Sequence, residues 1–141
     1  MNAMIGNGTR VLVVDDDEDV RQCITDRLEQ VGFAVVQASD GLQALAELHR
    51  RHFDVVVTDC NMPRLSGFDL LRQCRDAWPG TPVIIMSAAM NPTDDLAAAI
   101  GAFECLRKPF DADRVITLVV QAARLSGTLA PPLSESEPYS S

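Results

Sequence analysis

The sequence predicts an α/β fold with a five-stranded parallel sheet, and two patterns carry that prediction. Short apolar runs recur five times along the 141 residues, and segments with helical periodicity separate them. Alternating strands and helices are joined by right-handed crossovers, which give a parallel sheet with helices on both faces. In sheets of this kind the functional sites lie beyond the carboxyl ends of the strands.

The apolar runs have the composition of buried strands. The first four are rich in β-branched residues, which is typical of strands covered on both faces. The fifth is interrupted by Glu104, which predicts a strand at the edge of the sheet. The predicted strands are Val11–Val14, Phe33–Val36, Val55–Val57, Val83–Met86 and Phe103–Leu106.

Apolar residues at intervals of three and four predict the helices between these strands. Ser66 with Asp69 forms a capping-box pattern, and Asn91-Pro92 suits an N-cap followed by proline. Gly32 and Gly101 are typical of helix ends. The predicted apolar faces are Val20, Cys23, Ile24, Leu28 and Val31; Leu42, Leu45, Ala46 and His49; Leu70, Leu71, Cys74 and Trp78; and Val115, Leu118, Val119 and Ala122.

The length fits one domain. We expect a flexible N-terminus over residues 1–8, a folded domain over 9–126, and a disordered tail or linker over 127–141. The last segment is rich in proline, serine and glutamate and has no apolar period.

Composition excludes several classes of function. Twelve basic and 20 acidic residues give a net charge of −8, which argues against direct binding of nucleic acid or anionic lipid. No apolar run approaches the roughly 20 residues of a membrane helix, and the N-terminus has no apolar signal segment. The four cysteines form no close pair, which argues against a zinc site or disulfides and predicts a cytoplasmic protein with cysteines as small buried apolar residues.

Four predicted strands are followed by polar residues that can carry chemistry. Each has an ordinary explanation on its own, such as a helix cap or a surface charge, and Asp17, Glu18 and Asp19 are expected to be of that kind. Their occurrence together at one edge of the sheet predicts a shared site. The set comprises Asp15, Asp16 and the acidic run after the first strand, Asp59 after the third, Ser87 after the fourth and Lys108-Pro109 after the fifth.

The chemistry of this set is that of phosphoryl transfer. Carboxylates held close together repel one another unless a cation intervenes, and hard oxygen ligands favour Mg²⁺. A lysine and a hydroxyl can hold the remaining oxygens of a phosphoryl group. Phosphoryl transfer requires mainly positioning and charge neutralisation, and one carboxylate would be the nucleophile that forms an aspartyl phosphate.

The sequence resembles the bacterial response-regulator receiver domain over about residues 9–126. The matching motifs keep their order and spacing. They are Val-Leu-Val-Val-Asp15-Asp16-Asp17, Val-Val-Val-Thr-Asp59-Cys-Asn61-Met-Pro63-Arg-Leu-Ser-Gly67, Val-Ile-Ile-Met-Ser87-Ala88 and Leu-Arg-Lys108-Pro109-Phe110. The resemblance implies a flavodoxin-like sheet with the strand order 2-1-3-4-5 in a three-layer (βα)5 sandwich.

The resemblance also implies a role for each matching residue. Asp59 is the phosphoacceptor, and Asp15, Asp16, the Asp59 side chain and the backbone carbonyl of Asn61 hold Mg²⁺. Lys108 and Ser87 bind the phosphoryl oxygens. Ala88 is the small residue that leaves room for the phosphoryl group, and the Lys108-Pro109 bond is expected to be cis.

One position departs from the family pattern. Receiver domains usually carry Tyr or Phe three residues before the lysine, as the aromatic that moves with the hydroxyl residue on activation. This sequence has Cys105 there. Phe103 points to the same side of the strand but lies outside the switch position.

The function implied is that of a phosphorelay switch rather than a turnover enzyme. A histidine kinase or a histidine phosphotransfer protein would supply the phosphoryl group to Asp59. The surface formed by roughly residues 92–125, comprising the fourth helix, the fifth strand and the last helix, would shift between two packings. That surface would then bind an output partner or a second copy of the chain.

Two alternatives come from other classes of protein. A haloacid-dehalogenase-type phosphohydrolase would use Asp15 as the nucleophile of an Asp-x-Asp motif, with Ser87 and Lys108 downstream. That interpretation lacks a late acidic pair and leaves Asp59 and Asn61 unexplained. The second alternative is an interaction domain that is not phosphorylated. Every expected site residue is present, which argues against this alternative, and Cys105 is the only residue that favours it.

Overall fold

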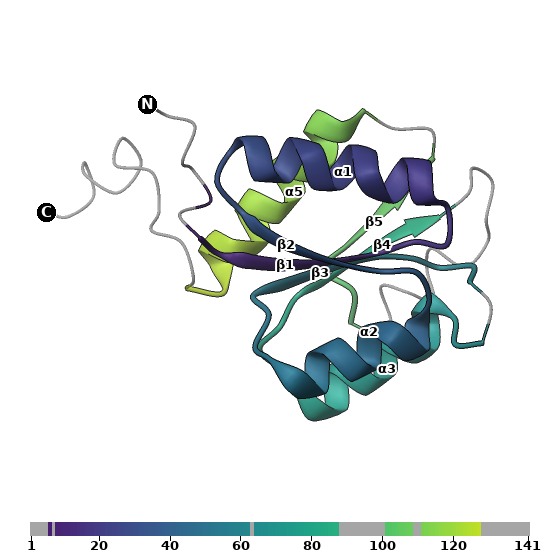
Figure 1. Cartoon of the computed structure of the whole chain (residues 1–141). Helices are drawn as coiled ribbons and strands as arrows, with labels where there is room; N and C mark the ends of the chain where they lie inside the picture. The colour runs from purple at the N-terminus through teal and green to yellow at the C-terminus, as the bar shows by residue number, and fades with distance from the viewer. Residues whose placement is uncertain (1–5, 7, 63, 88–100, 109–110, 128–141) are drawn as a thin grey trace, which may run out of the picture.

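A computed structural model describes residues 6, 8–62, 64–87, 101–108 and 111–127. Its described strands are all parallel and form one sheet in the order β2-β1-β3-β4-β5 (Figure 1). The predicted strand order is therefore confirmed, and the run interrupted by Glu104 lies at the sheet edge. The elements are β1 (Arg10–Val14), α1 (Glu18–Gln30), β2 (Ala34–Ala38), α2 (Gly41–Arg50), β3 (Val55–Asp59), α3 (Gly67–Ala77), β4 (Val83–Ser87), β5 (Glu104–Arg107) and α5 (Ala112–Leu125).

The sheet separates two apolar layers. Alternate residues of a strand point to opposite faces, so Val11 and Val13 pack with α1 and α5 while Leu12 and Val14 pack with α2 and α3. In Figure 1, α1 and α5 cover one face and α2 and α3 cover the other. β3 and β4 are buried along their whole length, as the β-branched runs predict.

Side chains begin the described helices as expected. Ser66 is the N-cap of α3, where its hydroxyl accepts the Asp69 backbone N–H at 3.2 Å. Asp17 caps α1 in the same way. Gly32 follows α1 with a φ of 99°, a left-handed conformation that favours glycine. The helix start predicted at Asn91-Pro92 lies outside the described residues.

Two predicted helix faces need correction. In α2 the buried residues are Gly41, Ala44 and Leu48, so the expected face of Leu42, Leu45, Ala46 and His49 is rotated from the observed one. The small residues Gly41 and Ala44 lie toward the core because α2 approaches its neighbours closely at its start. In α1, Cys23 is exposed, whereas Cys60 and Cys74 are buried as predicted.

The carboxyl ends of the strands meet at one edge of the sheet. β1, β3, β4 and β5 run side by side in parallel, and Asp59 and Ser87 are the last residues of β3 and β4. Along the described part of the chain, no helix combines the length and the apolar composition that a membrane crossing needs.

Candidate functional site

The structure brings four of the predicted site residues together from four neighbouring strands. Asp15 follows β1, Asp59 ends β3, Ser87 ends β4, and Lys108 follows β5. Ser87 lies opposite Arg107 in the β4–β5 register, and the Lys108 backbone N–H donates to the Ser87 carbonyl at 2.7 Å. The main-chain ladder therefore fixes where the lysine leaves the sheet.

Three carboxyl groups gather at this edge. Asp15, Asp16 and Asp59 each offer an oxygen atom, and these atoms all lie within 4.8 Å of one another. Asp15 is fully buried and Asp59 is 6% exposed, whereas Asp16 faces solvent. The cluster is therefore open to solvent on the side of Asp16.

Lys108 is the cation of the cluster. Its Nζ lies 3.0 Å from Oδ1 of Asp59 and 3.5 Å from Oδ2 of Asp15. Burial lowers the pKa of the Lys108 ammonium, but its contacts with Asp59 and Asp15 outweigh burial, and the net pKa lies above the ordinary value. The lysine is therefore charged throughout the physiological pH range.

Both buried carboxyl groups have raised pKa values. Burial is the main cause for Asp59, and the Asp15 and Asp16 charges add to it while Lys108 opposes it. Burial also raises the pKa of Asp15, against the Asp17 backbone N–H, which donates to Oδ1 at 2.9 Å, and against Lys108. The negative charge of this site is thus only partly neutralised by the protein itself.

This donor set fits Mg²⁺. The ion takes hard oxygen ligands, and ligands on opposite sides of it lie about 4.2 Å apart, a spacing that the three carboxylates approach. A divalent cation would also neutralise the carboxylate charge that Lys108 does not balance. Asn61, the fourth expected ligand through its carbonyl, is exposed in the loop between β3 and α3.

Arg21 supports the site, although the sequence motifs did not indicate it. Its Nη1 donates to the Asp15 backbone carbonyl at 2.8 Å, and its Nε donates to Oε1 of Gln37 at 2.8 Å. The guanidinium therefore ties the acidic turn after β1 to α1 and to β2. No sequence motif identifies this contact, because it depends on how α1 meets the turn after β1 and β2.

Gly67 allows α3 to start directly against the end of β3. A Cβ at this position would lie 2.3 Å from the Asp59 carbonyl oxygen and 2.7 Å from the Cys60 Cα, both of which are backbone atoms. The Gly67 N–H also donates to the Cys60 carbonyl at 3.0 Å. The final glycine of the motif that includes Asp59 therefore has a steric role.

Cys105 lies close to Ser87, although the β4–β5 register pairs it with Ile85. The Ser87 Oγ and the Cys105 Sγ are 3.9 Å apart, and Ser87 is fully buried. The residue at the usual aromatic position is therefore a small thiol in contact with the hydroxyl residue. The expectation that Phe103 shares a face with Cys105 is wrong, because β5 begins only at Glu104: Phe103 packs against the α1/α5 layer and Cys105 against the α2/α3 layer. Ala88 and Pro109, the two remaining predicted site residues, lie outside the described residues.

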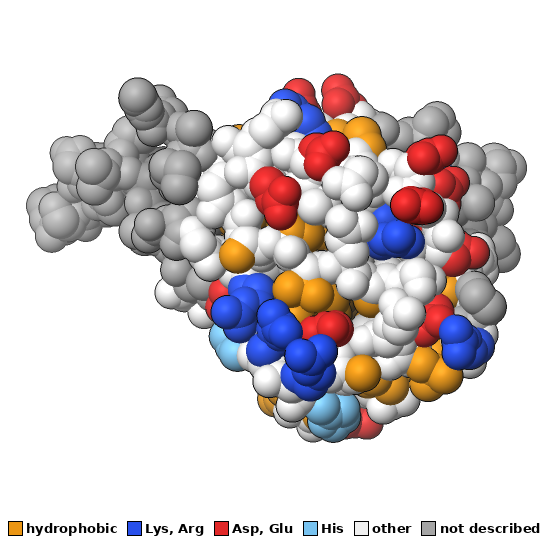
Figure 2. Space-filling view, in the orientation of Figure 1, with side chains coloured by type: hydrophobic (Ala, Val, Ile, Leu, Met, Phe, Trp, Pro, Cys, Tyr) orange, Lys and Arg blue, Asp and Glu red, His pale blue; other side chains and the backbone are white. Residues whose placement is uncertain are grey.

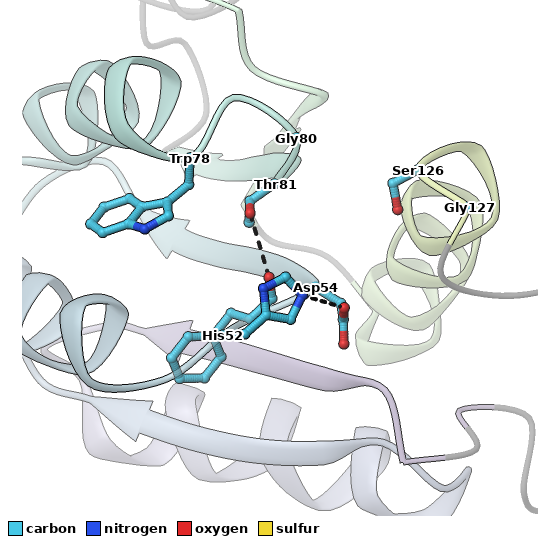
Figure 3. A pocket seen from close by; sticks show the side chains of 8 residues that line it. His52, Asp54, Trp78, Gly80, Thr81, Ser126 and Gly127 are labelled. Carbon is cyan, nitrogen blue, oxygen red and sulfur yellow. Dashed lines mark hydrogen bonds and ion pairs between the residues drawn. The ribbon is translucent and has the colours of Figure 1, made fainter.

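A cavity of about 400 Å³ lies at the opposite edge of the sheet, at the amino ends of the strands (Figure 3). His52, Asp54, Trp78 and Thr81 are among its lining residues. The polar groups of Asp54 already have partners, because Oδ1 is 2.9 Å from His52 Nε2 and Oδ2 accepts the Arg10 N–H at 2.8 Å. This cavity is separate from the acidic cluster and contains none of the predicted site residues.

A small basic patch lies at one end of α2. In Figure 2 basic and histidine side chains gather over one end of α2, where Arg50, Arg51 and His52 are exposed. Glu47 contacts both arginines, at 3.3 Å and 3.4 Å, and reduces the charge of this patch. The patch is local, and the whole chain has a net charge of −8.

Comparison with known proteins identifies similar domains. The sequence profile of the response regulator receiver domain matches residues 11–120. The virulence sensor protein BvgS of Bordetella bronchiseptica is 39% identical over 132 residues, which cover 87% of this chain and 11% of that protein. The DNA-binding transcriptional regulator NtrC of Salmonella typhimurium is 38% identical over 117 residues, which cover 79% of this chain and 24% of that protein.

A solved structure shows the same fold. A response regulator receiver domain protein from Clostridium thermocellum superposes with a TM-score of 0.80 at 34% identity, covering 84% of this chain and 97% of the other. The chain thus covers nearly the whole length of that structure, but it spans 24% or less of the two curated relatives above.

Proposed function

The chain belongs to the response regulator receiver domain family, and from this premise we propose that it accepts a phosphoryl group on Asp59. The observation that carries the proposal is the position of the Asp59 carboxylate, 3.0 Å from the Lys108 ammonium and within 4.8 Å of the Asp15 and Asp16 carboxylates. These contacts support phosphoryl transfer to Asp59, which requires positioning and charge neutralisation, because Lys108 lies beside the carboxylate and the neighbouring carboxylates could hold a cation.

The proposed reaction is a single displacement. An Asp59 carboxylate oxygen attacks the phosphorus of a phosphohistidine, a P–O bond forms, and the P–N bond breaks. The electron pair of that bond stays on the imidazole nitrogen of the donor, which takes up a proton. Asp15, Asp16, Asp59 and the Asn61 carbonyl would hold Mg²⁺, which would supply charge neutralisation for the phosphoryl transfer.

Lys108 and Ser87 are the proposed phosphoryl ligands. Lys108 already contacts Asp59, so it can follow the charge from the carboxylate to the new phosphoryl oxygens. Ser87 lies at the end of the neighbouring strand, and its carbonyl accepts the Lys108 N–H. A movement of Ser87 toward the phosphoryl group would therefore also shift the start of the segment that follows β5.

The proposed output surface comprises roughly residues 92–125, of which β5 and α5 are described. Cys105 replaces the usual aromatic beside Ser87, so the rearrangement of this surface must proceed without a large ring moving inward. The differential contacts of the phosphoryl group with the two states would set the balance between them. The surface would recruit an output partner or a second copy of this chain.

The proposed phosphoryl donor is a histidine kinase or a histidine phosphotransfer protein in the cytoplasm. One relative, BvgS, is named as a sensor protein, and another, NtrC, as a transcriptional regulator. The relatives thus include both a sensor protein and a transcriptional regulator. The proposed role is that of a signalling switch, with phosphorylation and dephosphorylation as its own reactions.

Intact mass after incubation with acetyl phosphate and Mg²⁺ tests this proposal. We expect the parent to gain one phosphoryl group, Asp59→Asn to gain none, and Asp15→Asn to gain it far more slowly because a metal ligand is lost. Asp76→Asn, an exposed change on α3, serves as the control with parent-like labelling. An unmodified parent would favour the interaction-domain interpretation, and steady phosphate release that needs Asp15 but not Asp59 would favour the phosphohydrolase.

A further inference from the structure

The loop between β3 and α3 is described at residues 60–62 and 64–66, which are here called the acceptor loop, and it carries the expected metal-binding carbonyl of Asn61. Where the loop leaves and rejoins the elements beside the sheet, the Gly67 N–H donates to the Cys60 carbonyl at 3.0 Å, and this hydrogen bond joins the two ends of the loop. The second half of the loop contacts the start of α2, an element that has no role in the phosphoryl chemistry above. Arg64 and Leu65 make these contacts.

Arg64 forms an ion pair with the first turn of α2. Its Nη2 lies 2.8 Å from Oδ2 of Asp40, whose side chain is 4% exposed. The other oxygen of Asp40 accepts the Gln43 N–H at 2.8 Å and caps α2. Both oxygens of this buried carboxylate are therefore engaged, one by its own helix and one by the acceptor loop.

The backbone of Arg64 is held in a conformation that its side chain disfavours. Its φ is 71°, and it is the one residue other than glycine in the described part of the chain with a φ in the left-handed region. Residues with a Cβ pay for this conformation in free energy, and it persists where surrounding contacts determine it. The ion pair with Asp40 is such a contact.

A steric contact accompanies the ion pair. A Cβ at Gly41, the residue after Asp40, would lie 2.4 Å from the Leu65 carbonyl oxygen. The acceptor loop thus meets α2 through two adjacent residues on each side, Arg64 and Leu65 against Asp40 and Gly41. The residue that follows the loop, Gly67, packs directly against the backbone of Asp59 and Cys60.

We propose that the ion pair between Arg64 and Asp40 is a clamp that holds the acceptor loop in its metal-binding arrangement, so both are positioning residues. The inference rests on the proposed function of this site. Asn61 lies three residues before Arg64, so a loop released at Arg64 no longer fixes the direction of the Asn61 carbonyl. Groups that orient metal ligands typically change metal affinity by about 10- to 100-fold when they are removed.

The test is a double-mutant cycle with Arg64→Ala and Asp40→Asn. Asparagine caps helices about as well as aspartate, so Asp40→Asn removes the charge and keeps the cap. We expect each single variant and the double variant to bind Mg²⁺ about tenfold more weakly by calorimetric titration. The effects of the two changes would not add, because either one breaks the same clamp.

Amide hydrogen exchange of Gly67 in the metal-free protein gives an independent readout. The Gly67 N–H closes the acceptor loop, and we expect its exchange to accelerate about tenfold in all three variants. Arg72→Ala, which breaks an exposed ion pair with Asp69 on α3, is the matched control and should leave both readouts unchanged. Arg64→Gly relieves the backbone strain without restoring the pair, so it should unfold at a higher temperature than Arg64→Ala yet bind Mg²⁺ equally weakly.

Additive effects, or parent-like Mg²⁺ affinity and Gly67 exchange in the single variants, would overturn the clamp. A parent protein that binds no Mg²⁺ would instead contradict the proposed function, and the exchange cycle would still decide whether the clamp exists.

Discussion

The Lys108 ammonium lies 3.0 Å from Oδ1 of Asp59 and 3.5 Å from Oδ2 of Asp15, so one cation stands between two buried carboxylates. Asp15 and Asp59 reach this position from the ends of two adjacent strands, and Lys108 reaches it from the edge strand. The lysine therefore has a structural role before any phosphoryl group arrives, since it partly neutralises the carboxylates.

Lys108→Gln should destabilise the metal-free protein by about 2 kcal/mol at pH 7.5. Removing one partner of a fully buried ion pair costs about 3–5 kcal/mol, and Lys108 is partly exposed. The loss should shrink as the pH falls, because the two carboxyl groups then take up protons and no longer need a cation. Urea unfolding followed by Trp78 fluorescence measures it.

Arg72→Gln is the control for this prediction. It removes an exposed charge that pairs with Asp69 at 3.0 Å, and such pairs contribute about 0–1 kcal/mol. Equal losses in Lys108→Gln and Arg72→Gln, or a loss that is the same at pH 5 and pH 7.5, would contradict the role assigned to Lys108.

Mg²⁺ should stabilise the protein at neutral pH and lose its effect in acid. At ten times its dissociation constant a ligand adds about 1.4 kcal/mol, which is about 5 °C in Tm for a domain of this size. Burial raises the pKa values of Asp15 and Asp59, so the folded metal-free protein binds more protons than the unfolded chain at pH just above 3.8. Its stability therefore falls as pH rises through that window, and Mg²⁺ restores it above the window.

Thermal unfolding with and without MgCl₂, at ionic strength matched with NaCl, measures this effect. Asp15→Asn should abolish most of the Mg²⁺-dependent shift at pH 7.5. A shift of the same size at pH 4 and pH 7.5 would show that Mg²⁺ binds elsewhere than at these carboxylates.

Gly67→Ala should destabilise the protein by about 2–4 kcal/mol and weaken the site. The added Cβ meets backbone atoms of Asp59 and Cys60, which cannot move aside as a side chain can. Gly80→Ala is the matched control, because nothing lies within 4 Å of a Cβ at Gly80. Chemical denaturation measures the free energy of unfolding of both variants. Equal values for Gly67→Ala and Gly80→Ala would contradict the close approach of Gly67 to the backbone of Asp59 and Cys60.

The cysteines should differ sharply in reactivity. Burial raises the pKa of Cys74 to about 12, so almost none of it is the reactive thiolate at pH 8. Cys23 is exposed on α1, whereas Cys60 is buried next to Asp59. Alkylation of the native protein followed by peptide mass analysis should therefore find Cys23 modified first, and Cys60 and Cys74 modified on unfolding. Rapid labelling of Cys74 in the native state would contradict its burial.

The resemblance to receiver domains predicted the strand order, and the interruption of the fifth apolar run at Glu104 predicted the edge position of β5, because apolar composition reports burial. The sequence patterns located the residues that the structure brings together at the strand ends, because a residue that follows a parallel strand must lie at the common edge. The face of α2 was harder to predict. Leu42 is apolar but 48% exposed, while the small residue Ala44 faces the core.

The supporting contacts could not be read from the sequence. Arg21 contacts the carbonyl of Asp15, and Arg64 contacts Asp40, which lies 24 positions earlier in the chain. Both are arginines whose partners depend on how loops meet in three dimensions, and neither belongs to an apolar period. The left-handed backbone at Arg64 is likewise invisible in the sequence, because glycine or asparagine would be the usual residue there.

The most direct test of the account is to locate the phosphoryl group on the chain. The parent is phosphorylated with acetyl phosphate and Mg²⁺ and then treated with borohydride, which reduces an acyl phosphate to an alcohol and so converts the modified aspartate to homoserine. Peptide mass mapping should find that conversion at Asp59 alone. Conversion at Asp15, or a phosphoryl group that resists reduction because it lies on Ser87, would contradict the central claim.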